Sequence, residues 1–113
     1  MVLASPLVSQ LLHEGRIEAL AVPQVATFEA GVQFARAEGI IPAPESCHAI
    51  RAAIDEALKC KVTGEAKTIL FSLTGHGHFD MASYDRYLAG QLEDYDYPRD
   101  AIDASLAHLP KVA

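Results

Sequence analysis

The fold class of this 113-residue chain is indicated most clearly by one stretch, Thr68-Ile-Leu-Phe-Ser-Leu-Thr-Gly-His-Gly-His-Phe-Asp80. Its first part, residues 68–73, is rich in strand formers, and its near-continuous apolarity predicts a strand buried on both faces, as in a parallel sheet. A loop of two glycines and two histidines follows, and Asp80 is suited to cap a helix. Side chains and backbone N–H groups converge where a strand ends and a helix begins, so this junction predicts a small-molecule or anion site.

Helices are expected on both sides of this strand, marked by prolines at their starts and glycines at their ends. Pro6 suits a first helical position, and Gly15 can end that helix. Pro42 and Pro44 favour extended backbone, which predicts an apolar turn before the next helix. The expected elements are helices at 6–14, from 24 or 27 to 37, at 44–59 and at 80–89, strands at 17–22 and 68–73, a polar loop at 61–67, an extended segment at 92–98 and a weak helix near 102–109.

Together these elements predict one α/β domain over residues 1–113, a partial three-layer arrangement with about two strands and four to five helices. Residues 92–113 are expected to form an extended tail and a weak helix. Two strands rarely make a self-sufficient sheet, and many of the hydrophobic residues are alanine, so the core should be thin. We therefore expect another polypeptide, a second copy or a different chain, to cover the open helix faces.

The charge and the cysteines narrow the class of protein. A formal net charge of −6 and the absence of a basic cluster argue against a nucleic-acid partner. Cys47 and Cys60 would lie ~20 Å apart on one helix, too far for a disulfide, and unpaired thiols fit a reducing compartment. No apolar run reaches the ~20 residues of a membrane span, and the N-terminus lacks a signal pattern. The expectation is a soluble cytoplasmic protein with no membrane partner.

The loop Gly75-His-Gly-His78 admits a functional and a structural interpretation. Its glycines would let the backbone approach a ligand and present N–H groups to an anion, or they would simply supply the positive φ that a strand-to-helix turn needs. His76, His78 and Asp80 also suggest a metal site, with His48 as the only further ligand, but the loop is short. We therefore predict no metal and expect the histidines to be solvated or hydrogen-bonded.

Glu45 is the carboxylate of most interest. At the start of a helix it gains from the helix dipole, which is a sufficient structural reason for its presence. Its functional interpretation is a group that faces a cofactor. The two cysteines lack a neighbouring base and orienting group, so neither is expected to be a nucleophile. The tyrosines are expected to pack rather than to catalyse.

Two segments, Ala37-Glu-Gly-Ile-Ile-Pro-Ala-Pro-Glu-Ser-Cys-His-Ala49 and Ile69-Leu-Phe-Ser-Leu-Thr-Gly-His-Gly-His-Phe-Asp80, resemble the C-terminal part of the tryptophan synthase β subunit, most closely its second, stand-alone type. Residues 6–13 and 28–36 are similar too, so the resemblance runs from near residue 5 to near residue 98. It implies part of a fold-type II pyridoxal-phosphate enzyme, a lyase of tryptophan biosynthesis that joins indole to L-serine.

By this resemblance, Glu45 is the predicted catalytic residue, matching a glutamate beside the cofactor ring. Thr74 matches the hydroxyl residue that hydrogen-bonds the pyridine nitrogen, and a neutral partner there moderates the cofactor's electron sink. Gly75 follows it against the ring, and His76 and Gly77 complete the predicted cofactor-binding stretch. These residues would form one wall of a cofactor pocket.

The departures from the family are equally informative. Nothing here matches the motif of the lysine that bonds the cofactor, and the glycine-rich phosphate loop is not found. We therefore expect the chain alone to bind no pyridoxal phosphate and to be inactive, either completing a pocket with an N-terminal β-subunit-like partner or kept for another use. The alternative is an oligomeric module that binds a small molecule or anion without catalysis. A metal-dependent hydrolase using His76, His78 and Asp80 ranks behind both.

Overall fold

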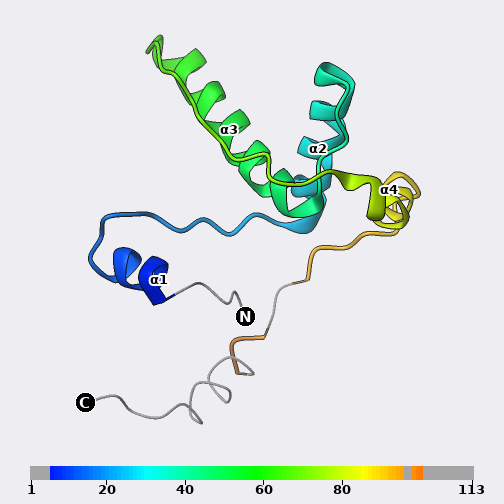
Figure 1. Ribbon diagram of the computed structural model, residues 1–113, viewed down its shortest axis with the longest axis horizontal. Helices are drawn as coiled ribbons and strands as arrows, with labels where there is room; N and C mark the ends of the chain where they lie inside the picture. Colours follow the sequence, from blue (N-terminus) through cyan, green and yellow to red (C-terminus); the bar gives the residue numbers. More distant parts are fainter. Residues whose placement is uncertain (1–5, 96–97, 101–113) are drawn as a thin grey trace.

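The computed structural model describes residues 6–95 and 98–100, and four helices and one 3-10 turn carry the regular structure of that part (Figure 1). The helices α2 and α3 pack together, run in the same general direction and diverge into a V, and α4 lies near the closed end of the V. The helix α1 stands apart at the end of an extended segment. In chain order the elements are α1 (Pro6–His13), α2 (Gln24–Glu38), α3 (Pro44–Thr63), η1 (Gly77–Phe79) and α4 (Met81–Leu88).

The helix boundaries follow the proline and glycine pattern of the sequence. Pro44 occupies the first turn of α3 beside Glu45, and the left-handed Gly64, with φ of 74°, ends it. Gly39 ends α2 in the same conformation, with φ of 73°. The predicted end of α3 near Lys59 was wrong: the helix continues to Thr63, because only Gly64 can adopt the left-handed cap, so the first part of the predicted 61–67 loop is helical.

The core is small and lies where α2, α3 and α4 meet. Phe28, Cys47 and Tyr84 form its buried cluster, and the ring of Phe28 meets that of Tyr84 edge to face at 5.1 Å. Gly31 permits the close approach of α2 to α3, because a Cβ added there would lie 2.5 Å from the Cys47 Sγ atom. Any side chain at position 31 would push the two helices apart.

Neither predicted strand is formed in the described residues, which corrects the α/β, three-layer prediction. Residues 17–22 and 68–73 are extended but have no ladder partner. The prediction that 68–73 is buried on both faces also fails, since Leu70 is 95% exposed. One face does pack, because Phe71 meets Phe34 of α2 edge to face at 5.9 Å. The physical reason is that strand propensity produces a strand only where another strand takes up the backbone hydrogen bonds.

The overall shape agrees with a thin core. The radius of gyration is 16.9 Å, whereas a compact domain of about this length has ~13 Å. Large apolar side chains remain exposed on α3, on the 68–73 segment and beyond it, including Val62, Leu70 and Phe79. The expected covering by a second polypeptide stays a prediction.

Two further expectations concern the chain ends and membranes. Residues 91–95 have no regular secondary structure, as predicted for the start of the acidic segment. The weak helix expected near 102–109 lies outside the described residues. Within the described part, none of the helices combines the length and the apolarity that a bilayer crossing requires.

Candidate functional site

The two segments that carry the family resemblance are joined directly by backbone hydrogen bonds. The Ala43 N–H donates to the Gly75 carbonyl at 2.9 Å, and the Gly77 N–H donates to the Ile41 carbonyl at 2.8 Å. These two bonds make an isolated antiparallel bridge between Pro42 and His76. The turn before α3 and the glycine–histidine loop are therefore one structural unit, which we call the paired turn (residues 41–43 and 75–77).

Neither glycine of the paired turn has a positive φ, and the reason for glycine here is close packing, which is severe at Gly77 and milder at Gly75. A Cβ on Gly77 would lie 2.5 Å from the Pro42 carbonyl oxygen and 2.8 Å from the Ile41 side chain. A Cβ on Gly75 would lie 3.0 Å from the Ala43 Cβ, which is tight but tolerable. The expectation that the loop needs glycine for a positive φ is therefore wrong for both glycines; Gly77 is required by close packing instead, and ligand contact stays a prediction.

The Tyr84 side chain of α4 holds the paired turn by a hydrogen bond. Its hydroxyl donates to the Pro42 carbonyl at 2.6 Å and lies 3.3 Å from the Cys47 Sγ atom. The Cys47 thiol in turn donates to the Ala43 carbonyl at 3.3 Å. Both side chains are buried, so this small polar network ties α4, the start of α3 and the paired turn together in a water-excluded position.

The same burial changes the acidity of both groups. Burial raises the pKa of the Tyr84 phenol strongly, and its hydrogen bond with Cys47 adds to the shift. Burial also raises the pKa of the Cys47 thiol, against a smaller lowering by the Tyr84 hydrogen bond. A thiol with a raised pKa and no solvent access is a poor nucleophile, in agreement with the structural role expected for the cysteines. Cys47 and Cys60 are both free, as predicted.

Glu45 and Thr74 both lie next to the Ala43–Gly75 end of the paired turn. Glu45 is in the first turn of α3, two residues after Ala43, and its side chain is exposed. Thr74 directly precedes Gly75 and is exposed as well. The structure thus brings the two positions, 29 residues apart in sequence, to the same end of one hydrogen-bonded unit. Their roles toward a cofactor stay predictions.

The histidines make local contacts. The Nδ1 atom of His76 accepts the His78 N–H at 3.3 Å, which caps the 3-10 turn, and the two rings lie 4.7 Å apart. His48 lies one turn along α3 and its Nδ1 atom is 3.1 Å from the Pro44 carbonyl. Among residues 6–95 and 98–100, no group of three or more His, Cys, Asp or Glu side chains could hold a metal ion. Asp80 occupies the cap position of α4 without a side-chain capping bond.

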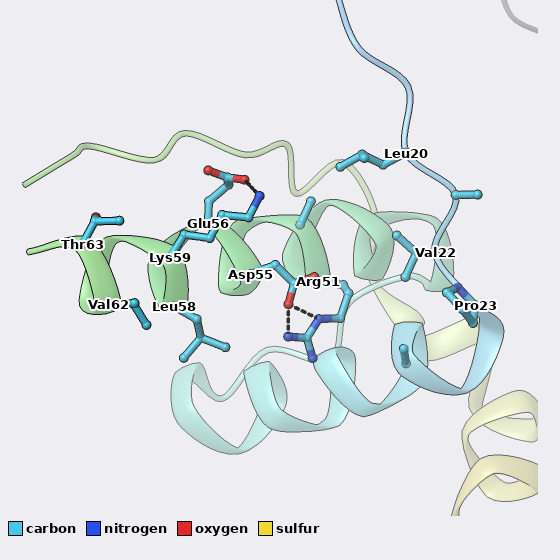
Figure 2. A pocket seen from close by; sticks show the side chains of 13 residues that line it. Leu20, Val22, Pro23, Arg51, Asp55, Glu56, Leu58, Lys59, Val62 and Thr63 are labelled. Atoms are coloured by element: carbon cyan, nitrogen blue, oxygen red, sulfur yellow. Dashed lines mark hydrogen bonds and ion pairs between the residues drawn. The ribbon is translucent and has the colours of Figure 1, made fainter. Parts of the chain in front are cut away.

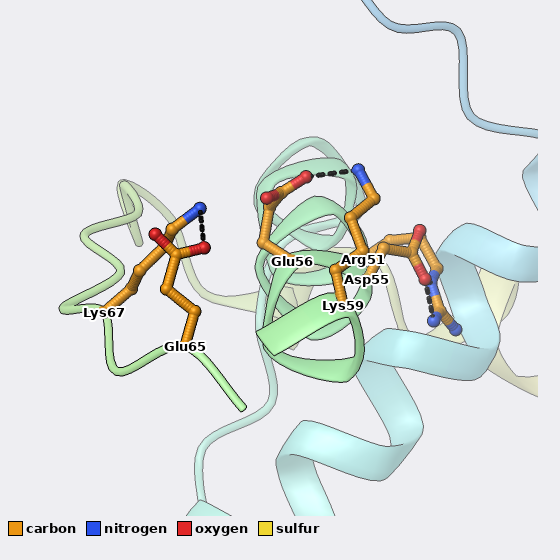
Figure 3. A network of polar contacts seen from close by, with 6 residues as sticks. All are labelled: Arg51, Asp55, Glu56, Lys59, Glu65 and Lys67. Atoms are coloured by element: carbon orange, nitrogen blue, oxygen red, sulfur yellow. Dashed lines mark hydrogen bonds and ion pairs between the residues drawn. The ribbon is translucent and has the colours of Figure 1, made fainter. Parts of the chain in front are cut away.

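A groove of about 740 Å³ lies away from the paired turn, between residues 20–23 and one face of α3 (Figure 2). Leu20, Val22, Leu58 and Val62 supply its apolar walls. Four charged side chains of α3 form two ion pairs, Arg51 with Asp55 and Lys59 with Glu56, and Lys67 pairs with Glu65 in the following loop (Figure 3). Such exposed pairs contribute little energy, and none of the predicted site residues lines this groove.

Sequence reasoning missed the residues that hold the site together. Tyr84 was expected to pack, which it does, but its hydrogen bond to Pro42 joins residues 42 apart. Gly31 was not singled out at all. The one available signal was that Gly31, Cys47 and Tyr84 each fall on the apolar face of a predicted helix, which does not reveal that the three faces meet.

Comparison with known proteins confirms the resemblance. No protein-family model matches the chain. It is 65% identical over 88 residues to tryptophan synthase beta chain 2 of Methanosarcina acetivorans, covering 78% of this chain and 20% of that protein. It is 63% identical over 90 residues to tryptophan synthase beta chain 2 of Aquifex aeolicus, covering 80% of this chain and 21% of that protein.

A protein named tryptophan synthase beta chain from Pyrococcus horikoshii is 52% identical over 92 residues, covering 81% of this chain and 20% of the relative. The chain thus spans about a fifth of the length of the curated relatives it matches. Over most of its own length it resembles a portion of tryptophan synthase β chains, as the sequence motifs predicted.

Proposed function

We propose that this chain supplies one wall of a pyridoxal-phosphate site in a tryptophan synthase β-like enzyme and is catalytically incomplete by itself. The observation that supports this most directly is the paired turn. It joins the two segments of the family resemblance, so that Glu45 and Thr74 leave one rigid unit as exposed polar side chains. A second polypeptide would bring the cofactor-binding lysine and the phosphate loop.

The Thr74 hydroxyl and the Glu45 carboxylate are suited to contact the ring of the cofactor. Thr74 offers a neutral hydroxyl, and Glu45 offers a carboxylate at the positive end of α3. The Pro42–His76 bridge holds the two segments of the paired turn in register. Tryptophan synthase β chains depend on pyridoxal phosphate, which supplies an electron sink for amino-acid chemistry. None of the residues in the paired turn is a lysine.

In the assembled site each group has a defined task. Thr74 would hold the pyridine nitrogen in place by hydrogen bonding without giving it a full positive charge. Glu45 would hold or deliver a proton at the substrate, where its exposure in the uncovered chain would be replaced by burial against the ring. Gly75, without a side chain, would leave room for the flat ring to lie against the backbone.

The proposal is tested by complementation. The purified chain is mixed with a β-subunit-like polypeptide that carries the lysine and the phosphate loop, and tryptophan is measured from indole, L-serine and pyridoxal phosphate. We expect tryptophan from the mixture and none from either chain alone. The chain turning over these substrates by itself would contradict the proposal.

Matched variants identify the contribution of the paired turn. Glu45→Gln should lower the rate of the mixture by about 10²-fold or more, the usual contribution of a proton-transferring group. Glu93→Gln, at another exposed carboxylate outside the turn, should leave the rate unchanged. Thr74→Val should alter the absorption spectrum of the bound cofactor as well as the rate. Stable self-assembly without activity in any mixture would favour the alternative, a binding module without catalysis.

A further inference from the structure

The helix α2 begins without a capping side chain of its own. Its N-cap residue is Pro23, which has no side-chain oxygen, and its first turn contains no acidic residue. Thr27 lies one turn further on, but its hydroxyl donates to the Pro23 carbonyl at 2.9 Å. The first backbone N–H groups of α2 therefore need an acceptor from another part of the chain or from water.

Asp94 supplies such an acceptor from a distant part of the sequence. Its Oδ1 atom accepts the Val25 N–H at 2.9 Å, and the two residues are 69 positions apart. The same contact brings a carboxylate to the positive end of the α2 dipole, where a negative charge is stabilising. The segment that follows α4 thus returns to the start of α2 and caps it.

Leu92 attaches this segment to the core at a second point. Its side chain is partly buried and packs against the cluster of Phe28, Cys47 and Tyr84. Residues 92–95 have no regular secondary structure, so their position depends on such contacts with the rest of the chain. An apolar contact at Leu92 and a helix cap at Asp94 hold the segment in place, with one exposed residue between them.

We propose that residues 92–95 form a strap that opens and closes as one unit over the start of α2. In the closed state Leu92 packs on the core while Asp94 caps α2, and in the open state both contacts are lost together. The hydrogen bond to Val25 is exposed, so water can replace it when the strap opens. A cap of this kind favours the closed state by about fivefold. The strap therefore opens locally, without unfolding of the helix pair.

Hydrogen exchange of the Val25 N–H reports on the strap directly. Asp94→Ala removes the acceptor, so this exchange should become about fivefold faster, whereas Asp94→Asn keeps a capping oxygen and should stay close to wild type. Glu93→Ala, at the neighbouring exposed carboxylate, is the matched control and should leave the Val25 rate unchanged. The Ile54 N–H in the middle of α3 is the internal reference. Equal Val25 exchange in wild type and Asp94→Ala, or equal acceleration in Glu93→Ala, would overturn the proposal.

Leu92→Ala tests whether the two contacts open together. This variant keeps the Asp94 carboxylate, yet Val25 exchange should become several-fold faster because the strap loses its contact with the core. Leu70→Ala is the matched control, since Leu70 is 95% exposed, and it should leave Val25 unchanged. If the Ile54 rate shows that Leu92→Ala unfolds globally, the milder Leu92→Val is measured in its place. Val25 exchange that does not respond to truncation of Leu92 would show that Asp94 caps α2 alone, and the strap would be refuted.

Discussion

Removing the Tyr84 hydroxyl tests whether the polar network under the paired turn stabilises the fold. In Tyr84→Phe the ring is kept, and so is its edge-to-face contact with Phe28 at 5.1 Å. What is lost is the donor to the Pro42 carbonyl at 2.6 Å and the partner of the Cys47 thiol at 3.3 Å.

The magnitude follows from burial. Tyr84 is 4% exposed and Pro42 is fully buried, so water cannot replace the lost donor. A buried acceptor left without a partner costs about 1–3 kcal/mol. We expect the free energy of unfolding to fall by about 2 kcal/mol, which for a domain of this size lowers the melting temperature by about 8–16 °C.

The measurement is urea and thermal unfolding followed by circular dichroism at 222 nm. Tyr87→Phe is the matched control, since Tyr87 also stacks on Phe28, with ring centroids 5.9 Å apart, and is only partly buried. Its effect should stay within about 0.5 kcal/mol. A Tyr84→Phe variant as stable as Tyr87→Phe would show that the network does not hold the paired turn.

Three further predictions concern the same region. Gly77→Ala should destabilise the chain by about 1–3 kcal/mol, because the new Cβ meets the Pro42 carbonyl at 2.5 Å, whereas Gly75→Ala should cost less; chemical unfolding compares them. Cys60 should react with a thiol reagent well before Cys47, which is buried with a raised pKa, and equal rates would contradict the assigned burial. Folding raises the pKa of both Cys47 and Tyr84 above their ordinary values of 9.0 and 10.0. The stability that the two neutral groups contribute is therefore present below pH 9 and falls as the pH rises beyond those values. Tyr84→Phe should make this decline less steep when the free energy of unfolding is measured from pH 7 to 11.

The helices could be predicted from sequence because their signals are local. Pro44 and Gly64 bracket α3, and Gly39 ends α2, so the helix types were correct and only the end of α3 was misplaced. The strands could not, because a ladder depends on a neighbour that the sequence of the segment does not contain. Residues 68–73 have the composition of a buried strand, yet in the described residues they remain extended and open.

The site was predicted in part for the same reason. Glu45 and Thr74 were selected by resemblance, and the structure places both next to the Ala43–Gly75 hydrogen bond of the paired turn. The bridge between Pro42 and His76 could not be foreseen, since nothing in either segment states that they pair. The hydrogen bond from Tyr84 to the paired turn was also not predicted. Its acceptor is a backbone carbonyl 42 residues away, and since every residue has a carbonyl, the sequence gives no sign of which one is used.

The paired turn and the open segment next to it should differ sharply in backbone protection. The N–H groups of Ala43 and Gly77 are bonded across the turn and held by the buried Tyr84, so their hydrogen exchange should be slowed toward the global limit of the helix pair. The Leu70 N–H has no such bond, and in a dilute sample it should exchange nearly as fast as in an unfolded peptide. Leu70 exchanging as slowly as Ala43 would mean that another segment covers residues 68–74, and the exposure assigned to Leu70 would then be wrong.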